Sequence, residues 1–143
     1  MRILVDSSVF IALFNQSDIF HVATVDLFEK LSEDKDKTNV MPIIVLLEVI
    51  NILHKRIKSF DERKVFQLFS SYETVDLTFD TAQSFLDFFK EVDLKTSDAI
   101  ITAVAKFTDS ILITWDEKLI KGAKNLISVQ TPESFLDYPQ TGN

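Results

Sequence analysis

The chain has no cysteine, only 2 glycines and 3 prolines among its 143 residues. Without cysteine it can form neither a disulfide framework nor a thiolate metal site, and a cysteine nucleophile is excluded. The longest apolar run, 41–53, is shorter than the ~20 residues that a membrane span requires, and Glu48 and Asn51 interrupt it. The N-terminus lacks the basic and then apolar pattern of a signal peptide. We therefore expect a soluble, cytoplasmic protein without membrane association.

Acidic residues outnumber basic ones by 22 to 15, and the formal net charge is −7. This charge argues against a general binder of polyanions, so a nucleic-acid function would need bound cations and a local basic patch. Phenylalanine is unusually common, at 13 residues, which predicts an aromatic-rich core. The length fits a single domain. We expect that domain over residues 1–138, followed by a short tail over 139–143.

Short apolar segments alternate with helical segments along the chain. The first pair is a predicted buried strand, Arg2–Val5, and a helix that contains the apolar run Val9–Phe14. Such alternation predicts an α/β fold with a mainly parallel sheet covered on both faces by helices. The other predicted strands lie at 40–41, 74–77, 111–114 and 127–129, and the other helices at 19–31, 42–58, after 59, 80–89, 98–107, after 116 and after 131.

Two details of these helices are also predicted. Ser59 with Glu62, and Asp80 with Gln83, have the spacing of helix N-terminal caps. The first half of the helix over 42–58 is apolar nearly all round, which predicts that it is buried.

Four acids occupy unusual positions in this pattern. Asp6 and Asp116 each follow an apolar strand, so in a parallel sheet both emerge at the edge outside which ligands bind. Glu48 lies inside the apolar helix without a cation four residues away, and burying it unpaired would cost roughly several kcal/mol. Asp98 stands in the first turn of its helix. We expect the four to converge on one crevice.

A divalent cation would resolve the repulsion among four such acids. Close carboxylates raise one another's pKa values and destabilise the fold. Mg²⁺ and Mn²⁺ take oxygen ligands and water, and so suit such a cluster. The hydroxyl groups of Ser7, Ser8 and Thr114 are placed to orient the carboxylates or a water ligand.

Each acid also has a simpler explanation when it is taken singly. Asp6 and Asp116 fit the N-cap position of the helix that follows each of them. Asp98 fits the positive end of its helix dipole. Glu48 fits an ion pair with a lysine or arginine from elsewhere in the chain.

Several segments together resemble the PIN domain family, and most closely the toxin nucleases of VapBC toxin–antitoxin pairs. They are ILVDSSVFIALF, VLLEVINIL, LKTSDAIITAVA, ILITWDEKL and TPESFL, in that order. The resemblance covers nearly the whole chain and implies a single three-layer domain. It matches Asp6, Glu48, Asp98 and Asp116 to the family's acidic metal-binding and catalytic positions. Ser8 and Thr114 match positions that commonly carry a hydroxyl or an amide.

The resemblance implies a metal-dependent endoribonuclease. One or two Mg²⁺ or Mn²⁺ ions, about 3.5–4 Å apart if two bind, would activate a water for in-line attack on a backbone phosphorus. The products would carry 5′-phosphate and 3′-hydroxyl ends. An RNA substrate, a small antitoxin that blocks the acidic site and a homodimer are the implied partners.

Basic residues near two of the acids are candidates for binding RNA phosphates, although they also fit ordinary surface positions. The apolar residues Phe10, Phe14 and Phe28 fit either an antitoxin surface or the core, and we expect the core. The basic candidates are Lys55, Arg56, Lys58, Lys118, Lys121 and Lys124.

Three alternatives to the metal-dependent nuclease remain. His21 and His54 could support metal-free acid–base cleavage, although neither lies in a strand-end motif and we expect surface or packing roles for both. A non-catalytic RNA- or protein-binding module is the second. A phosphotransfer receiver is the third, but it needs an adjacent acidic pair after the first strand, and Asp6 lies between Val5 and Ser7.

Overall fold

The computed structural model describes residues 1–137, so the predicted tail over 139–143 lies outside the described residues. Within them, five strands form one sheet in the order β3-β2-β1-β4-β5. All four pairings are parallel, as predicted. The strands are β1 (Arg2–Val5), β2 (Thr38–Pro42), β3 (Glu73–Val75), β4 (Ser110–Ile113) and β5 (Val129–Gln130).

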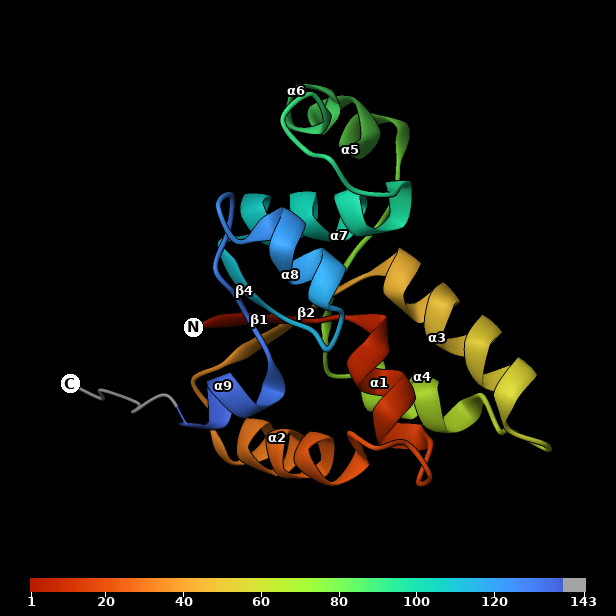
Figure 1. The fold of residues 1–143 in the computed structure, drawn as a ribbon. Helices are drawn as coiled ribbons and strands as arrows, with labels where there is room; N and C mark the ends of the chain where they lie inside the picture. The colour runs from red at the N-terminus through yellow and green to blue at the C-terminus, as the bar shows by residue number, and fades with distance from the viewer. Residues whose placement is uncertain (138–143) are drawn as a thin grey trace.

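Helices cover both faces of this sheet, which gives the predicted three-layer α/β fold. Figure 1 shows α7 and α8 on one side of the sheet and α2 with α9 on the other. The helices are α1 (Ser7–Phe14), α2 (His21–Glu33), α3 (Ile43–Arg56), α4 (Arg63–Phe69), α5 (Phe79–Ser84), α6 (Leu86–Phe89), α7 (Thr96–Phe107), α8 (Glu117–Ala123) and α9 (Pro132–Asp137). No helix of the described range is long and apolar enough to span a bilayer.

The strand order reverses between β1 and β4. From β1 the chain moves outward to β2 and β3, and it then returns to the other side of β1 through β4 and β5. Val5 pairs with Ile113 at the carboxyl ends of these two strands, and the Asp6 N–H continues the ladder to the Ile113 carbonyl at 2.9 Å. Such a switch point opens a crevice at the carboxyl ends of the strands.

The core is rich in phenylalanine, as the composition predicts. Phe10 is buried on α1, and its ring meets Phe69 edge to face at 4.6 Å and Phe28 at 5.4 Å between centroids. Phe14 and Phe28 are partly buried against the same cluster. All three predicted core residues therefore pack in or against the core.

Both predicted helix caps are wrong. Ser59 adopts a left-handed conformation, with φ of 60°, and α4 starts only at Arg63, whose N–H is bound by the Asp61 side chain. Helix α5 is capped by Thr78, not Asp80. The Thr78 hydroxyl accepts from the Thr81 N–H, and the Thr81 hydroxyl accepts from the Thr78 N–H.

The helix that carries Glu48 is buried on one side only, so the expectation that its first half is wholly buried is wrong. Its core face consists of Val45, Leu46, Val49 and Leu53, while the Leu47 side chain is 60% exposed. The predicted element boundaries also shift: the second helix starts at His21 instead of Ile19, the helix of Glu48 ends at Arg56, and the last strand spans 129–130.

Candidate functional site

Asp6 is fixed at the carboxyl end of the central strand by three hydrogen bonds to one oxygen. Its Oδ2 accepts from the Ser8 N–H at 3.3 Å, from Ser8 Oγ at 2.6 Å and from Thr114 Oγ1 at 2.8 Å. The Ser8 N–H contact makes Asp6 the N-cap of α1. Its other oxygen, Oδ1, meets only Ser7 Oγ, at 3.4 Å. One side of this buried carboxylate is therefore locked, and the other remains available to a ligand.

The two hydroxyl groups beside Asp6 have their donor and acceptor roles fixed by the backbone. The Trp115 N–H donates to Ser8 Oγ at 3.1 Å, and the Asp116 N–H donates to Thr114 Oγ1 at 3.0 Å. Each hydroxyl has a single proton, and donating it to Asp6 uses it. The strand end of β4 thus positions both hydroxyls, and these in turn orient the Asp6 carboxylate.

Asp116 is the N-cap of α8. Its Oδ1 accepts from the N–H groups of Lys118 at 2.8 Å and Leu119 at 3.1 Å. Its Oδ2 accepts no hydrogen bond from the described residues. Asp6 and Asp116 therefore both cap the helix that follows them, as the simpler explanation of these acids predicts. Each also keeps a second carboxylate oxygen for another partner.

Glu48 comes from α3 and meets a hydroxyl instead of a cation. Ser7 Oγ donates to Glu48 Oε2 at 2.9 Å and lies 3.4 Å from Asp6 Oδ1. Within residues 1–137 Glu48 forms no ion pair. The carboxylate is half-buried at the crevice, so it avoids the full cost of an unpaired buried charge.

Asp98 lies in the first turn of α7 and is buried. Burial raises the pKa of its carboxyl from an ordinary 3.8 to about 6, and the Lys95 ammonium, 3.6 Å from Oδ2, opposes this rise. The negative charges of Asp6, Asp116 and Glu48 raise the pKa of Asp98 further. The four predicted acids thus lie near enough to affect one another.

The donor set fits a hard divalent cation that keeps much of its water. Among residues 1–137, no three histidine, aspartate or glutamate side chains are arranged to hold one ion directly. Mg²⁺ usually binds through one or two carboxylates and retains several waters. Asp6 Oδ1 has a contact only at 3.4 Å, with Ser7, and Asp116 Oδ2 accepts no hydrogen bond from the described residues, so each acid keeps an oxygen for such an ion. The metal and catalytic roles of these residues remain predictions.

Lys95 is the basic residue that the sequence interpretation missed at the site. It is the N-cap residue of α7, its side chain is 67% exposed, and its ammonium lies 3.6 Å from Asp98 Oδ2. Its signal in the sequence is weak: a lysine three residues before an acid at a helix start. The six basic residues predicted to bind RNA are all exposed, and their RNA contacts remain untested.

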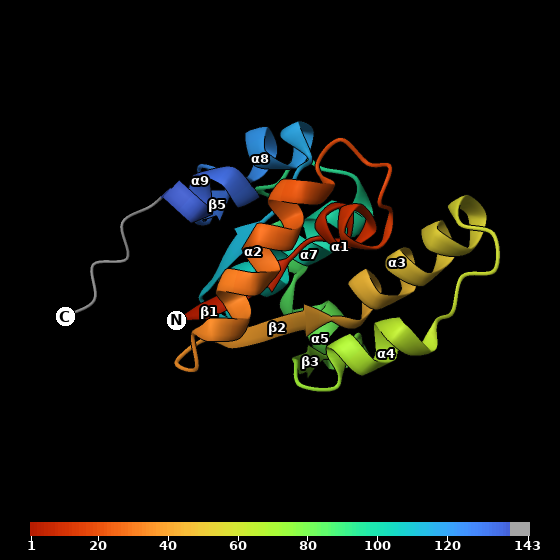
Figure 2. The same cartoon turned by 90° about the horizontal axis from the view of Figure 1, so that it is seen from below.

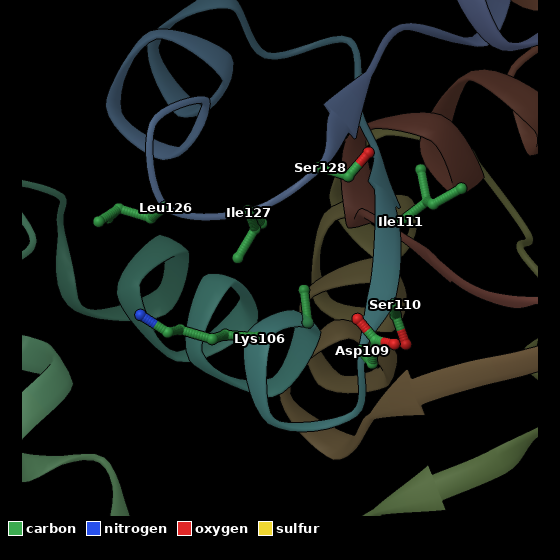
Figure 3. Close-up of a pocket in the computed structure, with 8 residues that line it drawn as sticks. Lys106, Asp109, Ser110, Ile111, Leu126, Ile127 and Ser128 are labelled. Carbon is green, nitrogen blue, oxygen red and sulfur yellow. The ribbon is translucent and has the colours of Figure 1, made fainter.

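The histidines and a cavity involve other residues than the four acids. His21 Nδ1 is 2.8 Å from the Ala12 carbonyl, and His54 is 3.6 Å from Glu62. Figure 3 shows a cavity lined by Lys106, Asp109 and neighbouring residues at the start of β4, the opposite end of that strand from Asp116. Neither feature shares a residue with the acidic cluster.

A comparison with protein families identifies the class of the chain. The model of the PIN domain matches residues 3–125. The chain therefore belongs to the PIN domain family, as the sequence motifs indicate. The comparison with curated proteins gave no match.

Solved structures with the same fold include toxins bound to their antitoxins. A toxin–antitoxin complex from Klebsiella pneumoniae is 25% identical, with a TM-score of 0.68, and the alignment covers 91% of this chain and 97% of that one. VapBC2 from Rickettsia felis, bound to a promoter DNA fragment, is 18% identical, with a TM-score of 0.68 over 92% and 98%. Mycobacterium tuberculosis VapC20, a toxin that cleaves the sarcin–ricin loop, is 20% identical, with a TM-score of 0.66 over 83% and 93%.

Proposed function

We propose that this protein is a metal-dependent endoribonuclease and the toxin of a toxin–antitoxin pair. The observation that carries the proposal is the convergence of Asp6, Glu48, Asp98 and Asp116 at the strand switch point, where the other three acids raise the pKa of Asp98. Four repelling carboxylates are costly to keep together unless a cation compensates them. Membership of the PIN domain family and the likeness to toxin–antitoxin complexes support the proposal.

Asp6 and Asp116 would hold Mg²⁺ or Mn²⁺, through the oxygens that their helix caps leave free. Such an ion, one or two per site, supplies positive charge to the phosphate and a water that ionises near neutral pH. Ser8 and Thr114 hold the Asp6 carboxylate in one orientation through their hydrogen bonds. The free oxygen of Asp6 would therefore have a fixed position for a metal ion. Hydrolysis on this pattern leaves 5′-phosphate and 3′-hydroxyl ends.

The overall charge of −7 repels RNA, so positively charged side chains near the acids must bind the RNA backbone. Lys95 stands at the acids, and Lys118 and Lys121 are exposed on α8, which begins directly after Asp116. Lys55 and Arg56 are exposed in the last turn of α3, the helix of Glu48. These residues would bind phosphates on either side of the cut.

A small antitoxin is the proposed protein partner, because the Klebsiella pneumoniae structure is a toxin–antitoxin complex that covers 91% of this chain. We further propose a homodimer in the cytoplasm, as the family resemblance implies. The molar mass of the purified protein in solution, measured by light scattering, tests the homodimer.

Cleavage of labelled RNA tests the nuclease. The protein is incubated with structured RNAs, including a sarcin–ricin loop hairpin, in Mg²⁺ or Mn²⁺, with and without EDTA. We expect cleavage that EDTA abolishes and that Asp98→Asn lowers at least a hundredfold. Mapping of the ends should give 5′-phosphate and 3′-hydroxyl groups.

Asp80→Asn is the matched control, because Asp80 also stands in the first turn of a helix, α5, and is exposed. It should cleave like the wild type. Cleavage that survives both EDTA and Asp98→Asn would overturn the carboxylate mechanism.

A further inference from the structure

The only tryptophan of the chain stacks on a phenylalanine beside the acidic site. The rings of Trp115 and Phe20 lie 4.2 Å apart between centroids, at an interplanar angle of 12°. Trp115 Nε1 donates to Thr24 Oγ1 at 2.9 Å, and Thr24 is fully buried on α2. The tryptophan ring is therefore fixed, and it holds Phe20 in a parallel orientation.

The backbone of Phe20 is fixed by hydrogen bonds, but its side chain is partly exposed to solvent. Its N–H donates to Asp18 Oδ1 at 2.9 Å, and its carbonyl accepts from the Thr24 N–H at 3.0 Å. The side chain is nevertheless 37% exposed, and its neighbours Ile19 and Val22 are 89% and 72% exposed. Core packing does not account for three exposed apolar residues at the start of α2.

This aromatic pair is directly connected to the acids. The Trp115 N–H donates to Ser8 Oγ, which binds Asp6, and Asp116 is the next residue in the chain. Figure 2 shows the connection between α1 and α2 beside the start of α8, the helix that Asp116 caps. Phe20 is therefore joined to the Asp6 carboxylate through its stack on Trp115 and the hydrogen bonds of Ser8.

We propose that Phe20, supported by Trp115, is a stacking platform for a nucleobase next to the cleaved phosphate. This inference rests on the proposed nuclease function and adds a contact to the base. A neutral π-face suits this place, because the acids repel the RNA backbone while every base carries a face that can stack on an aromatic ring. The platform favours single-stranded or unstacked nucleotides, since a base inside a duplex is already covered.

The fluorescence of Trp115 tests the platform without a need for cleavage, because no other tryptophan contributes. The wild-type protein in Ca²⁺, a cation with the same oxygen preference, is titrated with an adenosine RNA octamer. A second titration uses an octamer of abasic ribose phosphates, which has the same backbone charge without bases. We expect a saturable change in fluorescence with the adenosine octamer and at least about fivefold weaker binding of the abasic one.

Phe20→Leu keeps an apolar side chain of somewhat smaller volume and removes the aromatic face. It should weaken binding of the adenosine octamer at least about fivefold and leave binding of the abasic octamer unchanged. Phe79→Leu, on an exposed phenylalanine of α5 (84%), is the matched control and should bind like the wild type. Thermal unfolding of both variants verifies that they fold.

Equal binding of the two octamers by the wild type, no binding of either, or equal affinities in Phe20→Leu and the wild type would overturn the platform. The last result would indicate that the exposed turn serves a protein partner instead. The nuclease proposal is tested separately: it fails if the wild type shows no EDTA-sensitive cleavage.

Discussion

The Thr114 hydroxyl donates to Asp6 Oδ2 at 2.8 Å across two adjacent strands, between residues 108 positions apart in the chain. Thr114 Oγ1 itself accepts a hydrogen bond from the Asp116 N–H at 3.0 Å. One buried hydroxyl therefore connects the two acids that end β1 and β4. This connection makes the geometry of the proposed metal site depend on a residue that need not contact the metal.

Thr114→Val should separate this orienting role from folding. The substitution removes the donor to Asp6 and leaves the Asp116 N–H without its acceptor, at a cost of about 1–3 kcal/mol in the free energy of unfolding. Loss of an orienting hydrogen bond typically lowers metal affinity or activity by about 10–100-fold. Calorimetric titration with Mn²⁺ and kcat/KM for RNA cleavage measure both effects.

Thr114→Ser is the matched control because it restores the hydroxyl. It should recover most of the Mn²⁺ affinity, with some stability lost through the missing methyl group. Equal Mn²⁺ affinity in Thr114→Val and the wild type would show that the hydroxyl does not orient the site.

Asp98 should make the metal-free protein sensitive to pH. Its pKa is raised to about 6, so the folded state binds a proton more tightly than the unfolded state does. This term therefore lowers the stability as the pH rises from about 4 to about 6, and it is constant above that range. In EDTA at pH 7, Asp98→Asn should be more stable than the wild type by about 1–3 kcal/mol, since one pKa unit corresponds to about 1.4 kcal/mol.

Urea unfolding of both proteins at a series of pH values measures this difference. The gap between Asp98→Asn and the wild type should close as the pH falls to about 4, while Asp80→Asn should show no such dependence. A gap that is constant across the series, or an Asp98→Asn protein that is less stable at pH 7, contradicts the assignment.

Gly122 should be needed for the close approach of α8 to the turn that carries Lys95. A Cβ at position 122 would lie 2.4 Å from Leu94 Cδ2 and 3.0 Å from its Cγ. Gly122→Ala should therefore destabilise the fold by about 1 kcal/mol, because the cost of displacing the Leu94 side chain exceeds the ~1 kcal/mol that alanine gains over glycine inside a helix. Adding Leu94→Ala should remove this clash. Additive losses in the double variant, measured by thermal unfolding, would contradict a contact between these two positions.

The histidines should be dispensable for cleavage. His54 is exposed in the last turn of α3, and its Nε2 lies 3.6 Å from Glu62. His54→Gln should therefore keep kcat/KM within about twofold of the wild type and remain sensitive to EDTA. A His54→Gln protein that is folded but inactive would contradict this prediction and favour metal-free acid–base cleavage.

The sequence predicted the layers and the edge that carries the acids because both depend on residue pattern. Asp6 directly follows β1 and Asp116 follows β4 after two residues, so in a parallel sheet these acids emerge at the same edge. Glu48 was singled out because it lies inside an apolar helix, and Asp98 because it stands in a first helical turn; the family motifs then matched both. Neither spacing nor motif could show that Ser7 would be the partner of Glu48, because that contact depends on how α3 packs against α1.

Helix ends and surface aromatics were harder to predict. Thr78 and Asp80 both have side chains that can cap α5, and only the path of the backbone selects Thr78. Phe20 fits the apolar face of the second helix by its spacing, yet it precedes that helix and stacks on Trp115 instead. Such a contact between residues far apart in the chain leaves no periodic signal.

The binding of Mn²⁺ to the metal-free protein, measured by electron paramagnetic resonance, tests the central claim most directly. The wild type should bind one or two ions per chain, and Asp6→Asn should weaken the binding at least tenfold, while Asp80→Asn should bind like the wild type. Equal Mn²⁺ binding by Asp6→Asn and the wild type would contradict a metal site at the switch point between β1 and β4.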